Sequence, residues 1–357
     1  MKTLSALLEE HYISSLDELE TLLEKKDNSG QILDIPDNEN NVDLKQLTRI
    51  VLIGEMRYAS IREQEGITLD YADPTKLEYE LDDDIIKVDD GEYKFELKPD
   101  DRFNTVVFVR SGYKKPNVAF LLDEIIKMGI LVLNNPDNVH ISNDKFLTSL
   151  LLAKYNIPQP KNTLIVPHDI HKGEHDKFDK KLKTIYGNLD DNHKYVCKLL
   201  NGHGGKGVFI CRGSNILSVI QCMFAIDSET QVFVQEYIEI KEGDIRAHVI
   251  TLNGKQVLLD VTMRKKGGHD FRTNLSLGNS QETYELNEEQ TKVAFAAAKA
   301  SGLTWAGVDL LPAENGKTYV LEINGAPGAP SEIESDELKQ ANKDFYKKFI
   351  DTINSLC

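Results

Sequence analysis

The segment "GVDLLPAENGKTYVLEINGAPG", residues 307–328, contains two short apolar runs separated by a polar turn that includes glycine. This pattern predicts two adjacent antiparallel strands. With a four-residue turn at 313–316, Asp309 lies on the same strand face as Glu322 and Asn324. Two carboxylates and one amide oxygen are hard oxygen ligands that suit Mg²⁺ held together with phosphate oxygens. The segment therefore predicts a metal site.

This prediction depends on the register of the two strands. The assumed turn sets Asp309 opposite Val320, and a slip of one residue would move Asp309 to the other face of the sheet. The alternative interpretation is a polar sheet face open to water, because apolar neighbours such as Leu310 and Ile323 would still alternate inward.

A glycine-rich segment, "NGHGGKGV" at 201–208, has the spacing G-x-G-x-x-G. A dinucleotide-binding fold needs a helix directly after such a loop, but the strand-like run "VFIC" follows here. A Walker loop is also excluded, because Lys206 is followed by Gly207 rather than Ser or Thr. We expect a loop that connects two strands just after Lys198. Such a loop can fold over phosphates and donate its backbone N–H groups to them. The alternative is a long hairpin turn.

Basic side chains follow between the glycine-rich segment and the carboxylates. Arg246 lies in "GDIRAHV", and "MRKKGGHDFRTN" contains Arg264, Lys265, Lys266 and Arg272. Beside a site of carboxylates and Mg²⁺, such cations can hold phosphate or a substrate carboxylate, arginine often with two hydrogen bonds. The alternative for the two lysines is a solvated basic loop.

Three β-rich runs stand out in the first half of the chain: "RIVLIG" at 49–54, "TVVFVR" at 105–110 and "GILVLN" at 129–134. Apolar residues with helical spacing lie at 118–126, between the last two runs. Strand, helix and strand in this order predict a parallel βαβ unit. We expect the acidic insert at 70–101 to form an exposed hairpin or loop.

The remaining elements are predicted in the same way. Helical spacing at 1–28 is followed by a polar segment that we interpret as a linker. Later elements are helices at 143–156, 287–301 and 334–353, and a hairpin that turns at Asn253-Gly254.

The net charge of −16 over 357 residues is regional. Residues 1–45 carry 11 acidic and four basic side chains, and residues 70–101 carry 13 acidic and four basic ones, so these two segments account for all of it. Nonspecific nucleic-acid binding needs a positive field and is disfavoured. No run is long and apolar enough for a transmembrane helix, and four unpatterned cysteines make a reduced, cytoplasmic setting the expectation.

Several segments occur in the order found in ATP-grasp carboxylate–amine ligases: "NDKFLTSLLLAKYNIPQP", "VCKLLNGHGGKGV", "VQEYIEIKEGDIR", "FRTNLSLGN", "GVDLL" and "LEINGAPG". The series, over residues 105–357, most closely resembles the RimK-type branch, and glutathione synthetases are similar but more distant. The resemblance implies an α/β (α+β) ATP-grasp fold. Its expected parts are an acidic helical extension and linker (1–48), a parallel-sheet pre-ATP-grasp domain (49–141), a lid subdomain (142–237) and an antiparallel-sheet core (238–357).

The resemblance also implies nucleotide contacts. Lys145 and Lys198 would contact phosphate, and Lys198 would also reach the adenine edge. The loop at 201–207 would close over the phosphates through Gly204, Gly205, Lys206 and Gly207. The remaining contacts would come from the backbone of Glu236 and Ile238, from Gln235 and Tyr237 beside them, and from Asp244, or Glu239 and Glu242, at the ribose.

Further roles concern the reacting groups. By resemblance, Arg272 and Asn274 would face the transferred phosphoryl group and the acyl oxygen, and Lys198 would add positive charge. Asp309, Glu322 and Asn324 would hold two Mg²⁺ ions, with Mn²⁺ as a substitute. Candidate substrate-binding side chains are Arg110, at the end of "VVFVR", together with Arg246 and Arg264.

The expected activity is ATP-dependent formation of an amide. ATP would convert a carboxylate, expected to be an amino acid, into an acyl phosphate, and the amine of a small molecule, peptide or protein would displace phosphate. A dipeptide or glutathione-type synthetase, and a nucleotide-binding regulatory protein without turnover, are the alternatives, and a homo-oligomer stays open. Replacing Glu322 or Asp309 with alanine should abolish ATP turnover while the protein folds normally.

Histidines and cysteines suggest two smaller sites. His168, His171 and His175 have a spacing that would fit zinc, but their segment is polar and charged, and we favour a surface excursion. Cys197 and Cys211 flank the glycine-rich segment on strands predicted to be adjacent, where two small buried side chains are expected.

Overall fold

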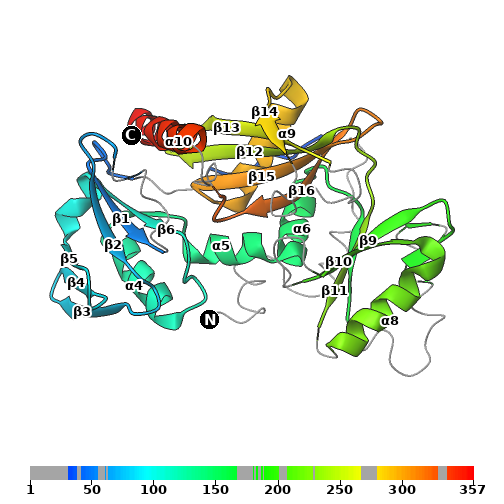
Figure 1. Ribbon diagram of the computed structural model, residues 1–357, viewed down its shortest axis with the longest axis horizontal. Coiled ribbons are helices and arrows are strands. Elements are labelled where there is room, and N and C mark those ends of the chain that lie inside the picture. Colours follow the sequence, from blue (N-terminus) through cyan, green and yellow to red (C-terminus); the bar gives the residue numbers. More distant parts are fainter. Residues whose placement is uncertain are drawn as a thin grey trace.

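The computed structural model describes residues 31–37, 42–54, 61, 63–166, 180, 182–183, 186–187, 189–200, 207–227, 230–266, 280–328 and 336–357. Figure 1 shows three neighbouring parts: an N-terminal sheet, a central sheet and a third sheet beside α8. The two helices expected at 1–28 lie outside the described residues.

The N-terminal sheet contains four parallel strands in the order β2-β1-β6-β7. Their bounds are β1 (Arg49–Ile53), β2 (Thr68–Ala72), β6 (Thr105–Val109) and β7 (Leu131–Leu133). Helix α4 (Pro116–Lys127) connects β6 to β7 and buries its apolar stripe against the sheet. The predicted parallel βαβ unit is therefore confirmed.

The acidic insert differs from the expectation. It contributes β2 to the parallel sheet and then forms a three-stranded antiparallel sheet of β3 (Glu78–Asp82), β4 (Ile85–Asp89) and β5 (Lys94–Leu97), followed by the 3-10 helix η1 (Pro99–Phe103). Alternation explains the difference, because Val88, Phe95 and Leu97 point into the core while charged residues point outward.

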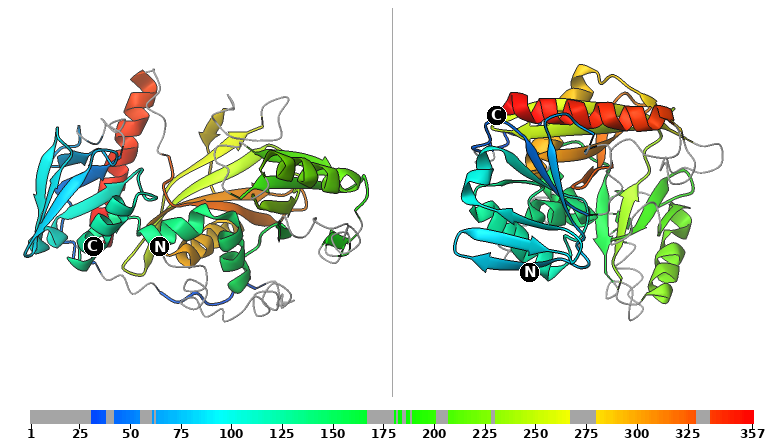
Figure 2. Two further views of the ribbon diagram at one scale, coloured as in Figure 1. Left: turned by 90° about the horizontal axis from the view of Figure 1, so that it is seen from below. Right: turned by 60° about the vertical axis from the view of Figure 1, so that its left-hand side comes forward.

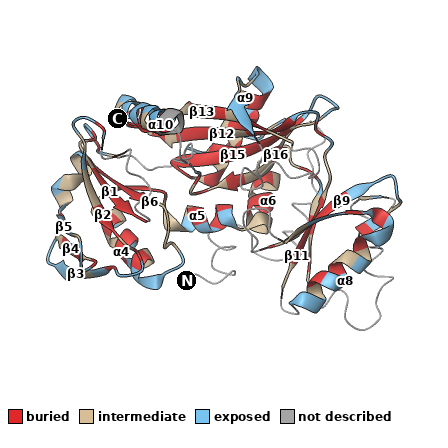
Figure 3. Ribbon diagram, viewed as in Figure 1, coloured by how far each residue is buried: buried red, intermediate tan, exposed pale blue. Residues whose placement is uncertain are grey.

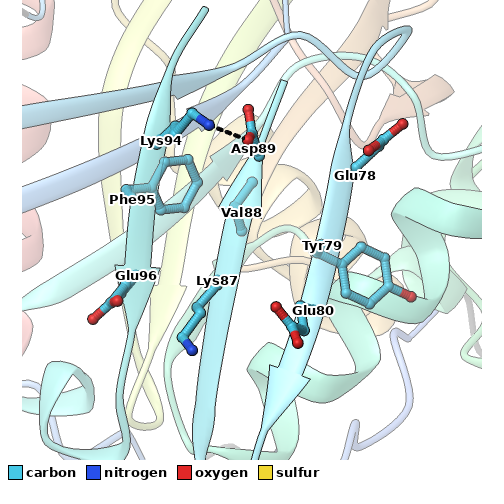
Figure 4. A pocket seen from close by; sticks show the side chains of 9 residues that line it. All are labelled: Glu78, Tyr79, Glu80, Lys87, Val88, Asp89, Lys94, Phe95 and Glu96. Atoms are coloured by element: carbon cyan, nitrogen blue, oxygen red, sulfur yellow. Dashed lines mark ion pairs between the residues drawn. The ribbon is translucent and has the colours of Figure 1, made fainter. Parts of the chain in front are cut away.

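The outward face of this small sheet is hollowed and lined by charged side chains, including Lys94 paired with Asp89 at 2.5 Å (Figure 4). None of the residues that line this hollow belongs to the predicted site.

The third sheet has the order β10-β9-β11-β8 and is antiparallel. It contains β8 (Asn162–Ile165), β9 (Lys194–Leu199), β10 (Val208–Arg212) and β11 (Val232–Glu236), with the 3-10 helix η3 (Gly213–Asn215) and helix α8 (Ile216–Ile226). Its buried side chains form a hydrophobic cluster of their own under α8. The thiol sulfurs of Cys197 and Cys211 lie 3.8 Å apart in this cluster, as the sequence indicated.

The central sheet is antiparallel, in the order β14-β13-β12-β15-β16. Its strands are β12 (Gly243–Leu252), β13 (Lys255–Lys265), β14 (Gln281–Thr283), β15 (Trp305–Pro312) and β16 (Thr318–Asn324). The predicted hairpin is confirmed, because Asn253 and Gly254 connect β12 to β13 with φ angles of 49° and 71°.

Helices cover both sides of the central sheet (Figures 1 and 2). They are α5 (Pro136–Asn143), α6 (Lys145–Lys154), α9 (Glu288–Ser301) and α10 (Asp336–Leu356). Residues 31–37, expected to be a linker, pack beside them, and Ile35 is buried against the core of the central sheet. Figure 3 shows that most residues of β12, β15, β1 and β6 are buried.

A single hydrophobic cluster joins the N-terminal sheet to the central sheet and α10. Phe108 of β6 stacks on Trp305 of β15, with 5.3 Å between ring centroids, and Phe349 of α10 contacts both rings. The two parts therefore share one hydrophobic cluster, each has a further cluster on its other face, and the third sheet has a cluster of its own.

Asn134 links these parts by hydrogen bonds. Its side-chain amide donates to the carbonyls of Trp305 and Gly325, each at 2.7 Å, and its Oδ1 accepts from the Trp305 N–H at 2.8 Å. We expect Asn134→Ala to lower the free energy of unfolding by about 2–4 kcal/mol, because buried backbone groups lose their partners. Urea unfolding would measure this. Asn117→Ala, which removes one partly buried bond to the Leu77 carbonyl, is the control and should cost about 1 kcal/mol. Equal losses would contradict the prediction.

Candidate active site

One face of the central sheet is polar over part of its area, and the rest of that face packs apolar side chains such as Ile250 and Leu252 against α10. Alternation along β12 puts Ile245, Ala247 and Val249 in the core, so Asp244, Arg246 and His248 share the polar face. Strand β15 adds Asp309 to this face, and β16 adds Glu322 and Asn324.

The register of β15 and β16 differs from the one assumed from the sequence. Asp309 is paired with Glu322, and it is Leu310 that lies opposite Val320. An irregularity between Asp309 and Leu310 shifts the ladder by one residue on β16, which restores the shared face. The prediction that Asp309 lies opposite Val320 is therefore wrong, although Asp309 and Glu322 do lie side by side.

Asp309 is enclosed by two guanidinium groups. Arg246, directly opposite on β12, donates from Nε to Oδ1 and from Nη2 to Oδ2, the latter at 2.8 Å. Arg264 donates from Nη2 to Oδ2 of Asp309 at 2.7 Å. The same Arg264 side chain donates from Nε to Asp244 at 3.0 Å and also pairs with it through Nη2. Two carboxylates and two guanidinium groups thus form a buried network with no net charge.

The two carboxyl groups that face each other have opposite pKa shifts. Although burial raises the pKa of Asp309, the guanidinium groups of Arg246 and Arg264 hold it well below its usual range. Burial and the neighbouring Asp309 raise the pKa of Glu322. The Asn324 amide donates to Glu322 at 3.3 Å and to the Gly307 carbonyl at 3.3 Å. Glu322 is therefore an acidic group that a nearby cation would stabilise as a carboxylate.

Two lysines lie close enough to Glu322 to interact with its charge. Lys145, at the start of α6, donates to the Leu200 carbonyl at 3.2 Å, and Lys198 of β9 donates to Gln235 of β11 at 2.7 Å. Burial lowers the pKa of both lysines, and Glu322 opposes this shift in each. Four separate elements thus bring two cations and two carboxylates together, which suits a phosphate chelated to a metal ion.

The lowered pKa of Lys198, about 8, leads to a prediction about pH. In the free protein the ammonium loses its proton as the pH rises through about 8, so with the ATP-dependent activity that the sequence resemblance implies, kcat/KM for ATP should fall above that pH. Lys198→Arg should remove this decrease, because arginine keeps its charge. Initial rates of ADP formation between pH 6.5 and 9.5 would measure both profiles. A wild-type profile that stays flat to pH 9.5 would contradict the prediction.

The strand β11 and the residues after it contain the predicted adenine contacts. Gln235 is buried, and its side-chain oxygen is bound to Lys198. The Glu236 N–H donates to the Lys161 carbonyl at 2.8 Å, so an adenine contact at this position has to use its carbonyl oxygen. The Tyr237 N–H donates to the Lys194 carbonyl at 3.1 Å. Ile238 follows directly in the chain.

The structure differs from the expectation for the ribose contact and for the substrate contact of Arg264. Asp244 is 1% exposed and bound to Arg264, so its carboxylate is an internal partner rather than a group presented to a ribose. Of the two alternatives, Glu239 pairs with Lys194 at 2.7 Å on the surface, and Glu242 is exposed. Arg264 is 8% exposed and binds two aspartates, which does not fit the predicted direct contact with a substrate carboxylate.

Arg110 lies at the junction of the N-terminal and central sheets. Its guanidinium carbon is 5.3 Å from the Phe108 ring centroid and 5.5 Å from that of Trp305. His248, which sequence reasoning missed, accepts a hydrogen bond from Trp305 Nε1 at 3.2 Å, and burial lowers its pKa to about 3. The signal available was its position two residues after Arg246, on the same strand face.

Several predicted residues cannot be placed. Gly204, Gly205, Lys206, Arg272, Asn274 and the three histidines His168, His171 and His175 lie outside the described residues. Gly207 is described and has a φ of 69°. A Cβ at this glycine would lie 2.5 Å from the Leu199 side chain, so the end of the loop requires glycine.

Oxygen donors that could hold a metal ion lie on β15 and β16. Within the described ranges, no group of three or more His, Cys, Asp or Glu side chains is arranged to hold a metal ion. Two carboxylates and an amide do meet at Asp309, Glu322 and Asn324, and such oxygen donors fit Mg²⁺ that keeps waters and phosphate oxygens as its other ligands.

Comparisons with known proteins show the family of the chain. Residues 142–353 match the model of the RimK-like ATP-grasp domain, so the chain belongs to this family. The chain is 34% identical over 205 residues to a probable alpha-L-glutamate ligase 1 of Shewanella sp. (strain W3-18-1). The aligned segment covers 56% of this chain and 61% of that protein. The chain is 31% identical over 231 residues to the tetrahydromethanopterin:alpha-L-glutamate ligase of Methanocaldococcus jannaschii, covering 63% of this chain and 72% of that one.

Solved structures are similar in fold. The D-alanyl-alanine synthetase A of Vibrio cholerae has a TM-score of 0.57 at 13% identity, covering 87% of this chain and 99% of that chain. The ATP-grasp ligase PsnB complexed with a minimal precursor also has a TM-score of 0.57, at 17% identity over 87% of this chain and 100% of that one. The fold is therefore the ATP-grasp fold.

Among the described helices, none is both long and apolar enough to cross a membrane.

Proposed function

We propose that this protein is an ATP-dependent carboxylate–amine ligase. The observation that carries the proposal is the meeting of Lys145 and Lys198 with Glu322 and Asp309, contributed by α6, β9, β16 and β15. Cations that face carboxylates across a junction of two sheets are suited to a nucleotide phosphate bridged to Mg²⁺.

The proposed reaction follows from the charges. A carboxylate is a poor acyl donor, and accepting the γ-phosphoryl group of ATP turns it into an acyl phosphate with a good leaving group. An amine then attacks the acyl carbon, which releases phosphate and leaves an amide and ADP. Positioning and positive charge contribute most of the catalysis of phosphoryl transfer, so no protein nucleophile is required.

The proposed residue roles rest on the positions of the described side chains and, for Arg272, Asn274 and residues 201–206, on the resemblance of the sequence alone. Lys145 and Lys198 would bind phosphate oxygens, and Asp309, Glu322 and Asn324 would hold two Mg²⁺ ions, or Mn²⁺ in their place. A metal ion held there would supply positive charge against the phosphate oxygens. Arg272 and Asn274 complete the site at the acyl oxygen, and the loop at 201–207 excludes water from the acyl phosphate.

The substrates are proposed as classes. The names of two relatives state glutamate ligation, which supports an amino acid as one substrate, and Arg110 is its proposed carboxylate anchor. The acceptor is an amine of a small molecule, a peptide or a protein. We also propose the boundaries 142–237 for the lid and 238–357 for the core, and a cytoplasmic setting. All four cysteines are free thiols, which supports that setting.

A screen of ADP and phosphate release would test this function. The purified protein would be incubated with ATP, Mg²⁺ and pooled amino acids, alone and with amine acceptors, and products would be identified by mass spectrometry. We expect ADP and phosphate in equal amounts together with an amide. No release under any condition would support a nucleotide-binding protein without turnover. ADP without free phosphate would support a kinase.

A further inference from the structure

The two arginines at Asp309 differ in what holds them. Arg246 hydrogen-bonds to Asp309 through two nitrogens, and its side chain is 15% exposed. Arg264 has a side chain that is 10% exposed, and it bonds to Asp309 and Asp244 at the same time. The Arg264 side chain therefore cannot turn away from Asp309 without also breaking its two hydrogen bonds to Asp244.

This asymmetry follows from strand register. Asp244 and Arg264 are direct partners across β12 and β13, and Arg246 and Asp309 are direct partners across β12 and β15. The bond from Arg264 to Asp309 crosses β12 and connects the two pairs. An arginine is suited to this because its planar guanidinium can contact two carboxylates in a fixed geometry, which an ammonium cannot do.

We infer that Arg264, anchored by Asp244, is a positioning residue that keeps the Asp309 carboxylate turned toward Glu322. Arg246 is then the partner that can turn from Asp309 to a phosphate or a substrate carboxylate. The inference rests on the proposed function, because it requires Asp309 to be a metal ligand. Side chains that orient metal ligands typically change metal affinity by about 10- to 100-fold when removed.

Metal binding is the direct test. Mn²⁺ binding to the full chain with ADP would be measured by electron paramagnetic resonance for the wild type, Arg264→Met and Arg264→Lys. We expect Arg264→Met to weaken Mn²⁺ binding by about 10- to 100-fold, and Arg264→Lys to recover only part of this loss. KM for the acyl substrate should change less than the Mg²⁺ activation constant.

Arg49→Met is a matched control, because Arg49 also bridges two aspartates, Asp70 at 2.7 Å and Asp101 at 3.2 Å, but does so in the N-terminal sheet. It should lower stability and leave Mn²⁺ affinity unchanged. If Arg264→Met does not fold, Asp244→Asn replaces it, since this change keeps an acceptor for Arg264 Nε but removes its counter-charge. It should weaken Mn²⁺ binding in the same direction.

Two results separate this inference from the proposed function. A wild-type protein that binds no Mn²⁺ with ADP would overturn the proposed function and the inference with it. A wild type that binds Mn²⁺, with the Arg264 or Asp244 variants binding it equally well, would overturn the inference alone. In the latter case, a raised KM for the acyl substrate would return Arg264 to direct substrate contact.

Discussion

Replacing Glu322 with glutamine should lower kcat for ADP formation by about 100- to 1,000-fold and leave the protein folded. The change removes a negative charge from the phosphate and metal site, where fixed charges contribute several kcal/mol to the transition state. Stability should be unchanged or slightly higher. Burial and Asp309 raise the pKa of Glu322, so the ionised carboxylate lowers the stability of the folded protein at pH values above that pKa, and glutamine removes this cost.

The assay is amine-dependent ADP formation, with urea unfolding measured on the same preparation. Glu282→Gln is the control, since Glu282 lies on β14 of the same sheet and pairs with Lys265 on the surface at 2.7 Å. This control should retain activity. Full amine-dependent turnover in a folded Glu322→Gln protein would remove Glu322 from the metal site.

Replacing Asp309 with alanine should lower the free energy of unfolding by about 3–5 kcal/mol, because Arg246 and Arg264 lose a shared partner in a buried setting. This corrects the expectation from the sequence that such a variant folds normally. For Glu322→Ala we keep that expectation, since none of the arginines of the network hydrogen-bonds to Glu322 in the described structure.

Urea unfolding followed by circular dichroism at pH 7.5 would compare Asp309→Ala with Glu322→Ala. The double variant Asp309→Leu with Arg246→Met should be more stable than Asp309→Ala, because it leaves only one guanidinium without Asp309 and fills the space with apolar atoms. Equal stability of the two single variants would show that the buried network contributes little.

Local pattern was sufficient for much of the fold. The parallel unit of β1, β6 and β7, the Asn253-Gly254 hairpin and α9 each have a periodicity or turn signal contained in a short window. The acidic insert was misjudged because its charge dominates the composition, whereas its folding depends on a few alternating apolar residues such as Val88 and Leu97. The net charge of the insert comes from the side chains on the solvent-facing side of that sheet, so it does not show which residues are buried.

The candidate site was predictable in its residue types and less so in its contacts. Lys145, Lys198, Asp309, Glu322 and Asn324 were named from spacing and resemblance, and the structure brings them together. Their partners could not be predicted, because Arg246 and Arg264 reach Asp309 across strands that are 45 to 63 residues away in the chain. His248 and Asn134 were missed for the same reason, since their bonds to Trp305 span 57 and 171 residues.

The sequence by itself determined that Glu322 and Asn324 lie on one face of their strand, because a period of two assigns faces within a strand once that strand is recognised. Only the tertiary structure decided that Asp309 is paired with Glu322 rather than Val320, and that two arginines already occupy it. A shift of one residue in a ladder and a guanidinium that crosses a strand depend on the packing of distant segments.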